Sequence, residues 1–408
     1  ARYLVNIIAL RLLTTISLYA LLILGLFFLP YSEQTTRVIL ILSLATIPEA
    51  IFTICQALFE AHERLFVPVL AAVVSAGIKL GLGLWLLFQG ASVVQIAWAV
   101  PLAVTLSLLI YIPGLISLFR RSPGQLPASL SLDFIRSQTG FMSSFFVIHL
   151  SSLLDYQTDA LLISLILTEA DVGYYAAAQT ILLAFNLMPL AIRTAIYPLM
   201  SRYYHTETDK LAVLYNYVSR YLMLFVLPMA AGVTLLAEPI IMLVFGEEFA
   251  PSVPVLQISI WAIVFLFLNV PHSRLMLIRN RQRVAGWFTG LAMVLNVMMN
   301  LVLIPRWGIN GAAVARLLST FAIYLSFYLY VRKNLMPSPL LPILVRPLIA
   351  TTIMVMVILP LREMNLLVPI LAGAAVYALA SFLLGAIPAQ DIAYWRQIVN
   401  FRASSLKE

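Results

Sequence analysis

The 408-residue sequence has few of the residues that build soluble enzymes or staple secreted domains. Charged residues make up only 10% of it, against about 25% in soluble proteins. A single cysteine, Cys55, lies inside an apolar run, which excludes a disulfide framework and a cysteine-based metal site. The sequence shows no nucleotide-binding loop, metal cluster or nucleophile triad. We therefore expect no catalytic residue, no metal and no cofactor, and a protein that is not an enzyme.

Apolar residues are abundant instead, at 62% of the chain. They fall in runs of about 20 to 28 residues, which fit a hydrocarbon core roughly 30 Å thick. The first run, Leu4 to Phe28, is too long for the apolar region of a signal peptide and contains Arg11. The composition predicts an all-α integral membrane protein.

Twelve transmembrane spans are predicted, with short connections and several internal prolines that predict kinks. The spans are Leu4 to Phe28, Val38 to Leu58, Phe66 to Phe88, Val93 to Leu118, Gln138 to Ile166, Asp171 to Met200, Leu211 to Leu236, Val253 to Ile278, Val284 to Ile304, Ala312 to Val331, Leu340 to Leu361 and Leu366 to Ile387.

Lysine and arginine gather on one side of this arrangement, whereas the other side has only Arg37, Arg306 and Arg362. The basic side carries Arg2, Arg64, Arg120, Arg121, Arg136, Arg202, Lys210, Arg279, Arg281, Arg283, Arg332, Lys333, Arg346, Arg396, Arg402 and Lys407. The positive-inside rule makes this side cytoplasmic, together with both chain ends. We expect a multi-pass protein of the cell (inner, cytoplasmic) membrane. The net charge of +8 reflects this topology and not nucleic-acid binding, because the bases form short clusters between spans.

An internal repeat relates the third and fourth spans to the ninth and tenth, with Gly90-Ala91-Ser92 matching Gly308-Ile309-Asn310-Gly311. The two copies have the same orientation, as in the parallel repeats of some transporters. The repeat pairs spans one to four with spans seven to ten and leaves spans five and six without partners. Two further helices before Ala1 are the simplest account; naturally unequal halves are the alternative. The predicted domains are a first lobe (1–120), a cytoplasmic linker (121–137), a second lobe (138–333), two extra helices (334–387) and a cytoplasmic tail (388–408).

Several stretches resemble the polysaccharide (O-antigen-type) flippases of the multidrug, oligosaccharidyl-lipid and polysaccharide exporter superfamily. They are Asp159 with Glu169 to Ala178, Pro198 to Ser201, Phe245 to Pro251, and Ile304 to Ala313. The resemblance implies two six-helix lobes and two extra helices, fourteen in all, of which this chain lacks the first two. It also implies alternating access and a polyprenyl-pyrophosphate-linked glycan as substrate. Membrane lipids, a polysaccharide polymerase and chain-length proteins are the partners it suggests.

Nine ionisable residues lie well inside spans, and each costs roughly 2.5 kcal/mol or more if it faces lipid. They are Arg11, Glu49, Lys79, Asp155, Asp159, Arg193, Arg220, Arg274 and Arg316. A hydrated cavity between the lobes is the simplest way to hold them. We predict that Arg11, Lys79, Arg193 and Arg316 bind substrate there, and that Arg220 and Arg274 belong to the cytoplasmic boundary.

The acidic residues Glu49, Asp155 and Asp159 are predicted to balance charge or to couple transport to an ion. Asp155 and Asp159 are four residues apart and share one helix face. They bind H⁺ or Na⁺, pair with Arg193, or pack helices together; the sequence leaves these three open. Lys79 lines the cavity or pairs with Glu49. His272, beside Pro271, is a packed residue at a helix bend or part of a proton relay.

The function predicted from these features is export of a lipid-pyrophosphate-linked oligosaccharide from the inner to the outer leaflet through a cationic cavity. A cation-coupled multidrug exporter of the same superfamily is an alternative, although bases outnumber acids inside the spans. A polytopic polysaccharide polymerase or glycosyltransferase is a further alternative. Such an enzyme needs a large aqueous site with paired carboxylates, and the acidic pair Glu247-Glu248 fits a solvated loop better.

Overall fold

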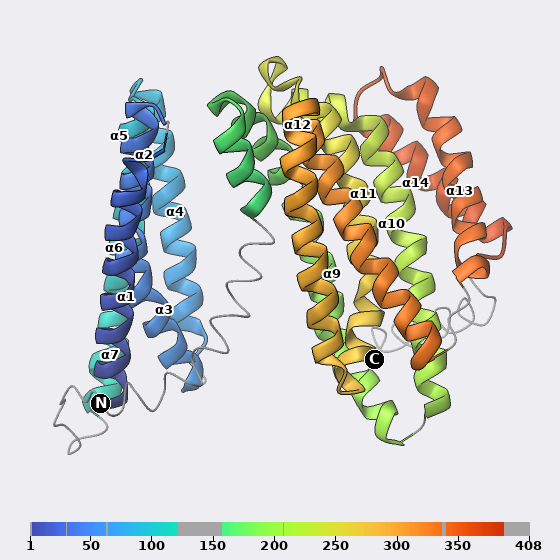
Figure 1. Ribbon diagram of the computed structural model, residues 1–408, viewed down its shortest axis with the longest axis horizontal. Coiled ribbons are helices and arrows are strands. Elements are labelled where there is room, and N and C mark those ends of the chain that lie inside the picture. Colours follow the sequence, from blue (N-terminus) through green and yellow to red (C-terminus); the bar gives the residue numbers. More distant parts are fainter. Residues whose placement is uncertain are drawn as a thin grey trace, which may run out of the picture. The chain divides into compact units, whose positions relative to one another are not determined.

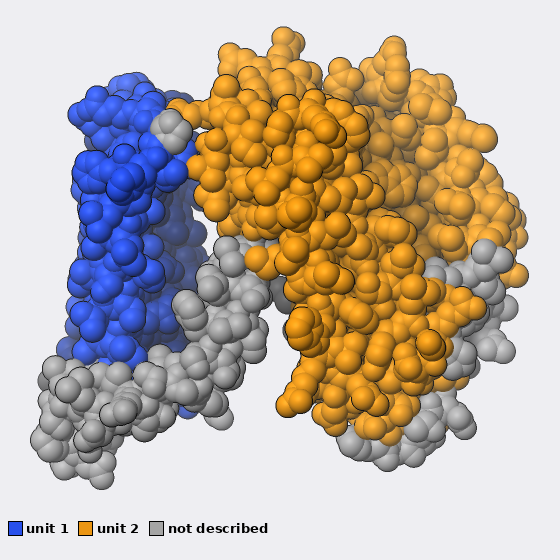
Figure 2. Space-filling view, in the orientation of Figure 1, with its two compact units in different colours: residues 1–150 blue, residues 151–408 orange. Residues whose placement is uncertain are grey.

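The computed structural model describes residues 2–29, 31–62, 64–120, 157–206, 208–336 and 340–386, and these are helical with no strand (Figure 1). The all-α prediction is confirmed. The chain divides into two compact units, Ala1–Leu150 and Ser151–Glu408, shown in different colours in Figure 2. Within the described residues, eight helices are long and apolar enough to cross a membrane.

Unit 1 contains seven α-helices and a 3-10 turn in its described part. They are α1 (Arg2–Leu26), α2 (Glu33–Leu44), α3 (Thr46–Ala61), α4 (Phe66–Phe88), α5 (Val93–Ala97), α6 (Ala99–Ser107), η1 (Leu108–Ile110) and α7 (Tyr111–Arg120). Short breaks at Ala45 and Trp98 interrupt the second and fourth predicted spans, but both residues keep helical dihedral angles, and each span is still one candidate membrane crossing. Pro48 and Pro101 explain the breaks, because each lacks the N–H that would bond the carbonyl four residues earlier, at Leu44 and Ala97. Those two residues are the last of α2 and α5.

Unit 2 begins, in its described part, with a helix over Gln157–Ile166, the end of the fifth predicted span. Then follow α9 (Glu169–Thr206), α10 (Thr208–Phe245), η2 (Glu247–Phe249), α11 (Ser252–Ile278), α12 (Gln282–Asn334), α13 (Leu340–Leu361) and α14 (Leu367–Leu383). α11 packs against α9, α10 and α12 and is buried on several faces, so it forms the centre of this unit. The predicted linker, the start of the fifth span and the C-terminal tail lie outside the described residues.

α12 is a helical hairpin that corresponds to the ninth and tenth predicted spans. Gly308 breaks the helix with φ 58° and ψ −141°, a conformation that favours glycine. The two arms lie side by side, because Asn296 in the first donates to Ser319 in the second. Gly311 lets them approach, since a Cβ there would lie 2.2 Å from the carbonyl oxygen of Leu303. The turn therefore falls within the glycine-rich stretch from which the sequence predicted it.

Candidate functional site

A cavity of about 470 Å³ lies inside unit 2, between α9, α11, the two arms of α12 and the helix that carries Asp159. The wall on α9 consists of Tyr175, Gln179, Leu182, Asn186 and Arg193. Their spacing of three, four or seven residues places them on one face of that helix. Four of the five are polar, so this face of a membrane-embedded helix is built for contact with water or a polar ligand.

The facing walls are also rich in uncharged hydrogen-bonding groups. α11 contributes Ser259 and Asn269, and the arms of α12 contribute Thr289 and Thr320. In the described part of the chain, the Ser259 hydroxyl and the Asn269 side-chain carbonyl oxygen are buried without a hydrogen-bond partner. Buried polar atoms normally find partners, so these two are available to a ligand or to water in the cavity.

The Asp159 carboxylate, in a residue only 2% exposed, is the centre of a hydrogen-bond network at one end of the cavity. Its Oδ1 accepts from Asn300 Nδ2 at 2.7 Å. Its Oδ2 accepts from the Tyr175 hydroxyl at 2.9 Å and from Arg316 Nε at 2.6 Å. The Arg316 contact is also an ion pair, in which the guanidinium side chain is 17% exposed. Both carboxylate oxygens are therefore occupied, and the negative charge is matched by one positive charge.

A second layer of amides supports this pair. Asn300 also donates to Asn296 at 3.1 Å, and Asn296 donates to Ser319 at 3.3 Å. The network joins the Asp159 helix to α9 and to both arms of α12. Asp159, Tyr175, Asn300 and Arg316 each lie about two turns from the nearest chain reversal, at Thr168 or Gly308, and Asn296 and Ser319 lie about one turn further away.

The structure brings together three of the residues predicted from the sequence. Asp159, Arg193 and Arg316 line the cavity in unit 2. Asp159 pairs with a base, as one of the open alternatives proposed, but that base is Arg316 and not Arg193. Among the described residues, no ion pair involves Arg193. Asp155 lies outside the described residues.

The remaining predicted residues belong to unit 1. Arg11 on α1, Glu49 on α3 and Lys79 on α4 are each exposed at the surface of that unit. The pair considered between Lys79 and Glu49 is not formed, since no ion pair joins them in the part of unit 1 that the structure describes.

The uncharged members of the site were not predicted from the sequence: Asn296, Asn300, Ser319 and Tyr175. A signal for two of them existed. Asn296 and Asn300 are four residues apart in an apolar span, so they share a helix face, and amides in a membrane need hydrogen-bond partners.

The fold is that of a known class of membrane exporters. Over 94% of this chain and 83% of the other, the structure matches the inward closed conformation of lipid II flippase MurJ with a TM-score of 0.79 and 16% sequence identity. It matches the eukaryotic MATE transporter AtDTX14 over 84% of this chain and 80% of that one, with a TM-score of 0.55 and 16% identity. At such identities these matches show the fold alone: that of the superfamily of multidrug and polysaccharide exporters.

Sequence comparison narrows the class to a family. The family model described as polysaccharide biosynthesis protein matches residues 3–254, and the model for lipid II flippase MurJ matches residues 135–383. A curated relative, the probable low-salt glycan biosynthesis flippase Agl15 of Haloferax volcanii, is 30% identical over 163 residues. That alignment spans 40% of this chain and only 34% of the relative. The chain belongs to the polysaccharide flippase family of the superfamily, which confirms the resemblance seen in its sequence.

Proposed function

We propose that the protein moves a lipid-linked oligosaccharide across the membrane, with a pyrophosphate between lipid and sugar. Family membership supports this proposal, and one observation in the cavity carries it. Arg193 is a cation in a polar cavity and takes part in no ion pair within the described residues. A cationic side chain in a membrane protein needs an anionic partner or water, and a pyrophosphate would supply two phosphates.

The uncharged walls suit the sugar part of such a substrate. Amide and hydroxyl side chains both donate and accept hydrogen bonds, as sugar hydroxyls do. Gln179 and Asn186 lie on the same face of α9 as Arg193, and Ser259 and Asn269 face them from α11. We propose that these four groups bind the glycan while Arg193 binds phosphate.

Arg316 was predicted to bind substrate, and its ion pair suggests a different role. Its charge is already balanced by Asp159 at 2.6 Å. The same contact makes Asp159 a poor site for an external cation, because the guanidinium of Arg316 occupies one of its oxygens and Asn300 the other. We propose that this pair organises the cavity end and that Na⁺ does not bind at Asp159.

Transport then follows the topology predicted from the sequence: two lobes, 1–120 and 138–333, cytoplasmic termini, and alternating access in the inner membrane. Export of a negative headgroup along an inside-negative potential gains about 2.3 kcal/mol per charge per 100 mV. A cation-coupled drug exporter is less well supported at this cavity, because Asp159, the carboxylate that lines it among the described residues, is held by Arg316.

Vesicles containing the purified protein and a fluorescent lipid-pyrophosphate oligosaccharide provide the test. A hydrogen bond to a charged group contributes about 1.5 to 3 kcal/mol, so Arg193→Ala should weaken binding and transport by roughly 10-fold to 150-fold. Arg193→Lys should retain part of the activity. The matched control is Arg306→Ala, because Arg306 is exposed and does not line the cavity. Transport by Arg193→Ala at the rate of the control would refute the proposal.

A further inference from the structure

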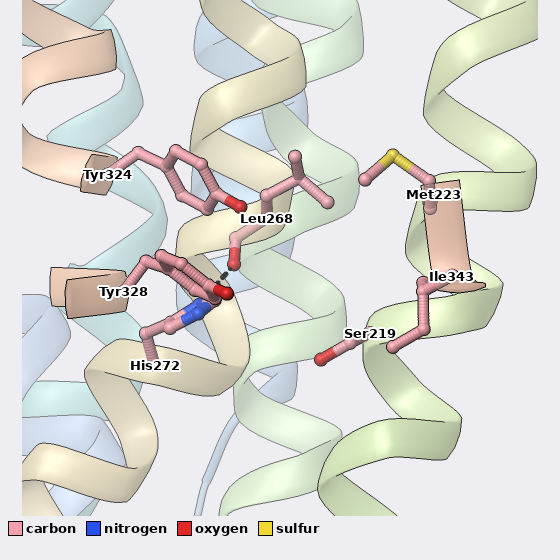
Figure 3. A pocket seen from close by; sticks show the side chains of 7 residues that line it. All are labelled: Ser219, Met223, Leu268, His272, Tyr324, Tyr328 and Ile343. Atoms are coloured by element: carbon pink, nitrogen blue, oxygen red, sulfur yellow. Dashed lines mark hydrogen bonds between the residues drawn. The ribbon is translucent and has the colours of Figure 1, made fainter. Parts of the chain in front are cut away.

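A second, much smaller cavity of about 20 Å³ lies between α10, α11, α12 and α13. Figure 3 shows His272, Tyr324 and Tyr328 along one side of it and Ser219, Met223 and Ile343 along the other. A cavity needs roughly 10 to 15 Å³ of this kind of volume to hold one water molecule. The space is therefore large enough for one water and too small for an organic ligand.

The hydrogen bonding of His272 fixes the tautomer of its ring and leaves Nε2 as the nitrogen available to this space. Its Nδ1 lies 2.6 Å from the carbonyl oxygen of Leu268. A carbonyl oxygen only accepts, so Nδ1 must carry the hydrogen and donate it. In the neutral ring, Nε2 then has a lone pair, and it is buried without a partner in the described part of the chain. His272 itself is 3% exposed.

Aromatic rings surround the imidazole. The ring centroids of Tyr215, Tyr324 and Tyr328 lie 5.6, 5.6 and 5.9 Å from that of His272, all in edge-to-face geometry. These are the titratable groups that face it from α10 and α12, and α13 contributes only Ile343 to the cavity. On α11 itself, Arg274 is the nearest basic residue, and its guanidinium lies over the ring of Tyr197 on α9.

We propose that the small cavity holds one water bonded to Nε2, and that His272 is a proton-binding site of unit 2. A proton carried by this water moves to the Nε2 lone pair, and the ring becomes an imidazolium with one added positive charge. Nδ1 continues to donate to Leu268, and Nε2–H now donates to the water. The tyrosine and serine hydroxyls that line the cavity provide acceptors for the water.

The position of His272 connects this site to the larger cavity. Leu268 on α11 and Tyr324 on α12 line the small cavity. Their chain neighbours, Asn269 and Ile323, line the larger one. Pro271 lacks the N–H that would bond the Phe267 carbonyl, so the helix is least constrained beside His272. A charge added there changes the bend of α11 and, with it, the wall that carries Ser259 and Asn269. This coupling rests on the proposed transport function; the proton site itself does not.

Solid-state NMR of the whole protein in lipid bilayers tests the site directly. His272 is the only one of the four histidines that follows a proline, so ¹³C-carbonyl proline with ¹⁵N-histidine identifies its signals without a mutation. The neutral form should be the Nδ1–H tautomer, its Nε2 should contact water protons, and acidification should convert it to imidazolium. An Nε2–H tautomer, a dry Nε2 or a ring that stays neutral down to the pH of unfolding would overturn the proposal.

Transport in vesicles tests the coupling. A pH gradient should change the wild-type rate, and His272→Gln should abolish that response while Arg306→Ala retains it. An unchanged response in His272→Gln would overturn the coupling. The two proposals can fail separately. If His272 is hydrated and titrates but the protein moves no glycan, only the transport function is refuted. If the protein transports glycan but His272 is the Nε2–H tautomer, only the proton site is refuted.

Discussion

Replacing Arg316 with methionine should destabilise unit 2 strongly, because it leaves the Asp159 carboxylate charged and buried. Asp159 is the more buried partner, with its side chain 3% exposed against 17% for Arg316. Of the donors in the described residues, Asn300 and Tyr175 still bond the carboxylate after the change. Removing one partner of a buried ion pair costs about 3 to 5 kcal/mol. Asp159→Asn should cost less, about 1 to 3 kcal/mol, since the remaining guanidinium faces a cavity that water can enter.

The double variant, Asp159→Asn with Arg316→Met, separates this explanation from a simple loss of packing. It contains no unpaired charge, so it should be more stable than Arg316→Met alone, with a coupling energy of about 2 to 3 kcal/mol. Free energies of unfolding measured by steric trapping in bicelles provide the values, with Arg306→Met as the exposed control. Strictly additive effects of the two changes, or an Arg316→Met variant as stable as the control, would refute the reasoning.

Two further predictions concern the packing of unit 2. Gly311→Ala places a Cβ against the carbonyl oxygen of Leu303 and should destabilise the hairpin by more than about 1 kcal/mol. Gly290→Ala, which has open space around it, is the control and should be neutral or stabilising. Thermal unfolding in detergent compares the two variants, and equal unfolding midpoints would contradict the prediction. Tyr377→Phe removes the hydroxyl that donates to the Leu224 carbonyl at 2.6 Å and joins α14 to α10. It should lower the free energy of unfolding by about 0.5 to 1.5 kcal/mol, and an unchanged unfolding midpoint would show that this hydrogen bond contributes nothing.

Much of the fold was predictable from the sequence, because long apolar runs and glycine-containing turns are local signals. The turn at Gly308 is an example. Asp159 was also recognisable, since a carboxylate in an apolar span is costly. Its partner was not, because Arg316 lies 157 residues away and only the tertiary fold brings the two together. Asn300 was missed for another reason: only charged side chains were taken as a signal, although an amide in an apolar span also needs a hydrogen-bond partner. Pro101 was expected to kink a span, and the structure interrupts the helix there at Trp98 alone, whose backbone stays helical.

The residues of α9 that line the cavity span a long stretch of the helix. From Tyr175 to Arg193 it extends about 27 Å along the helix axis, close to the roughly 30 Å thickness of the hydrocarbon core. Under the proposed transport function, a headgroup moving along α9 would meet Gln179, Asn186 and Arg193 in turn over most of that thickness.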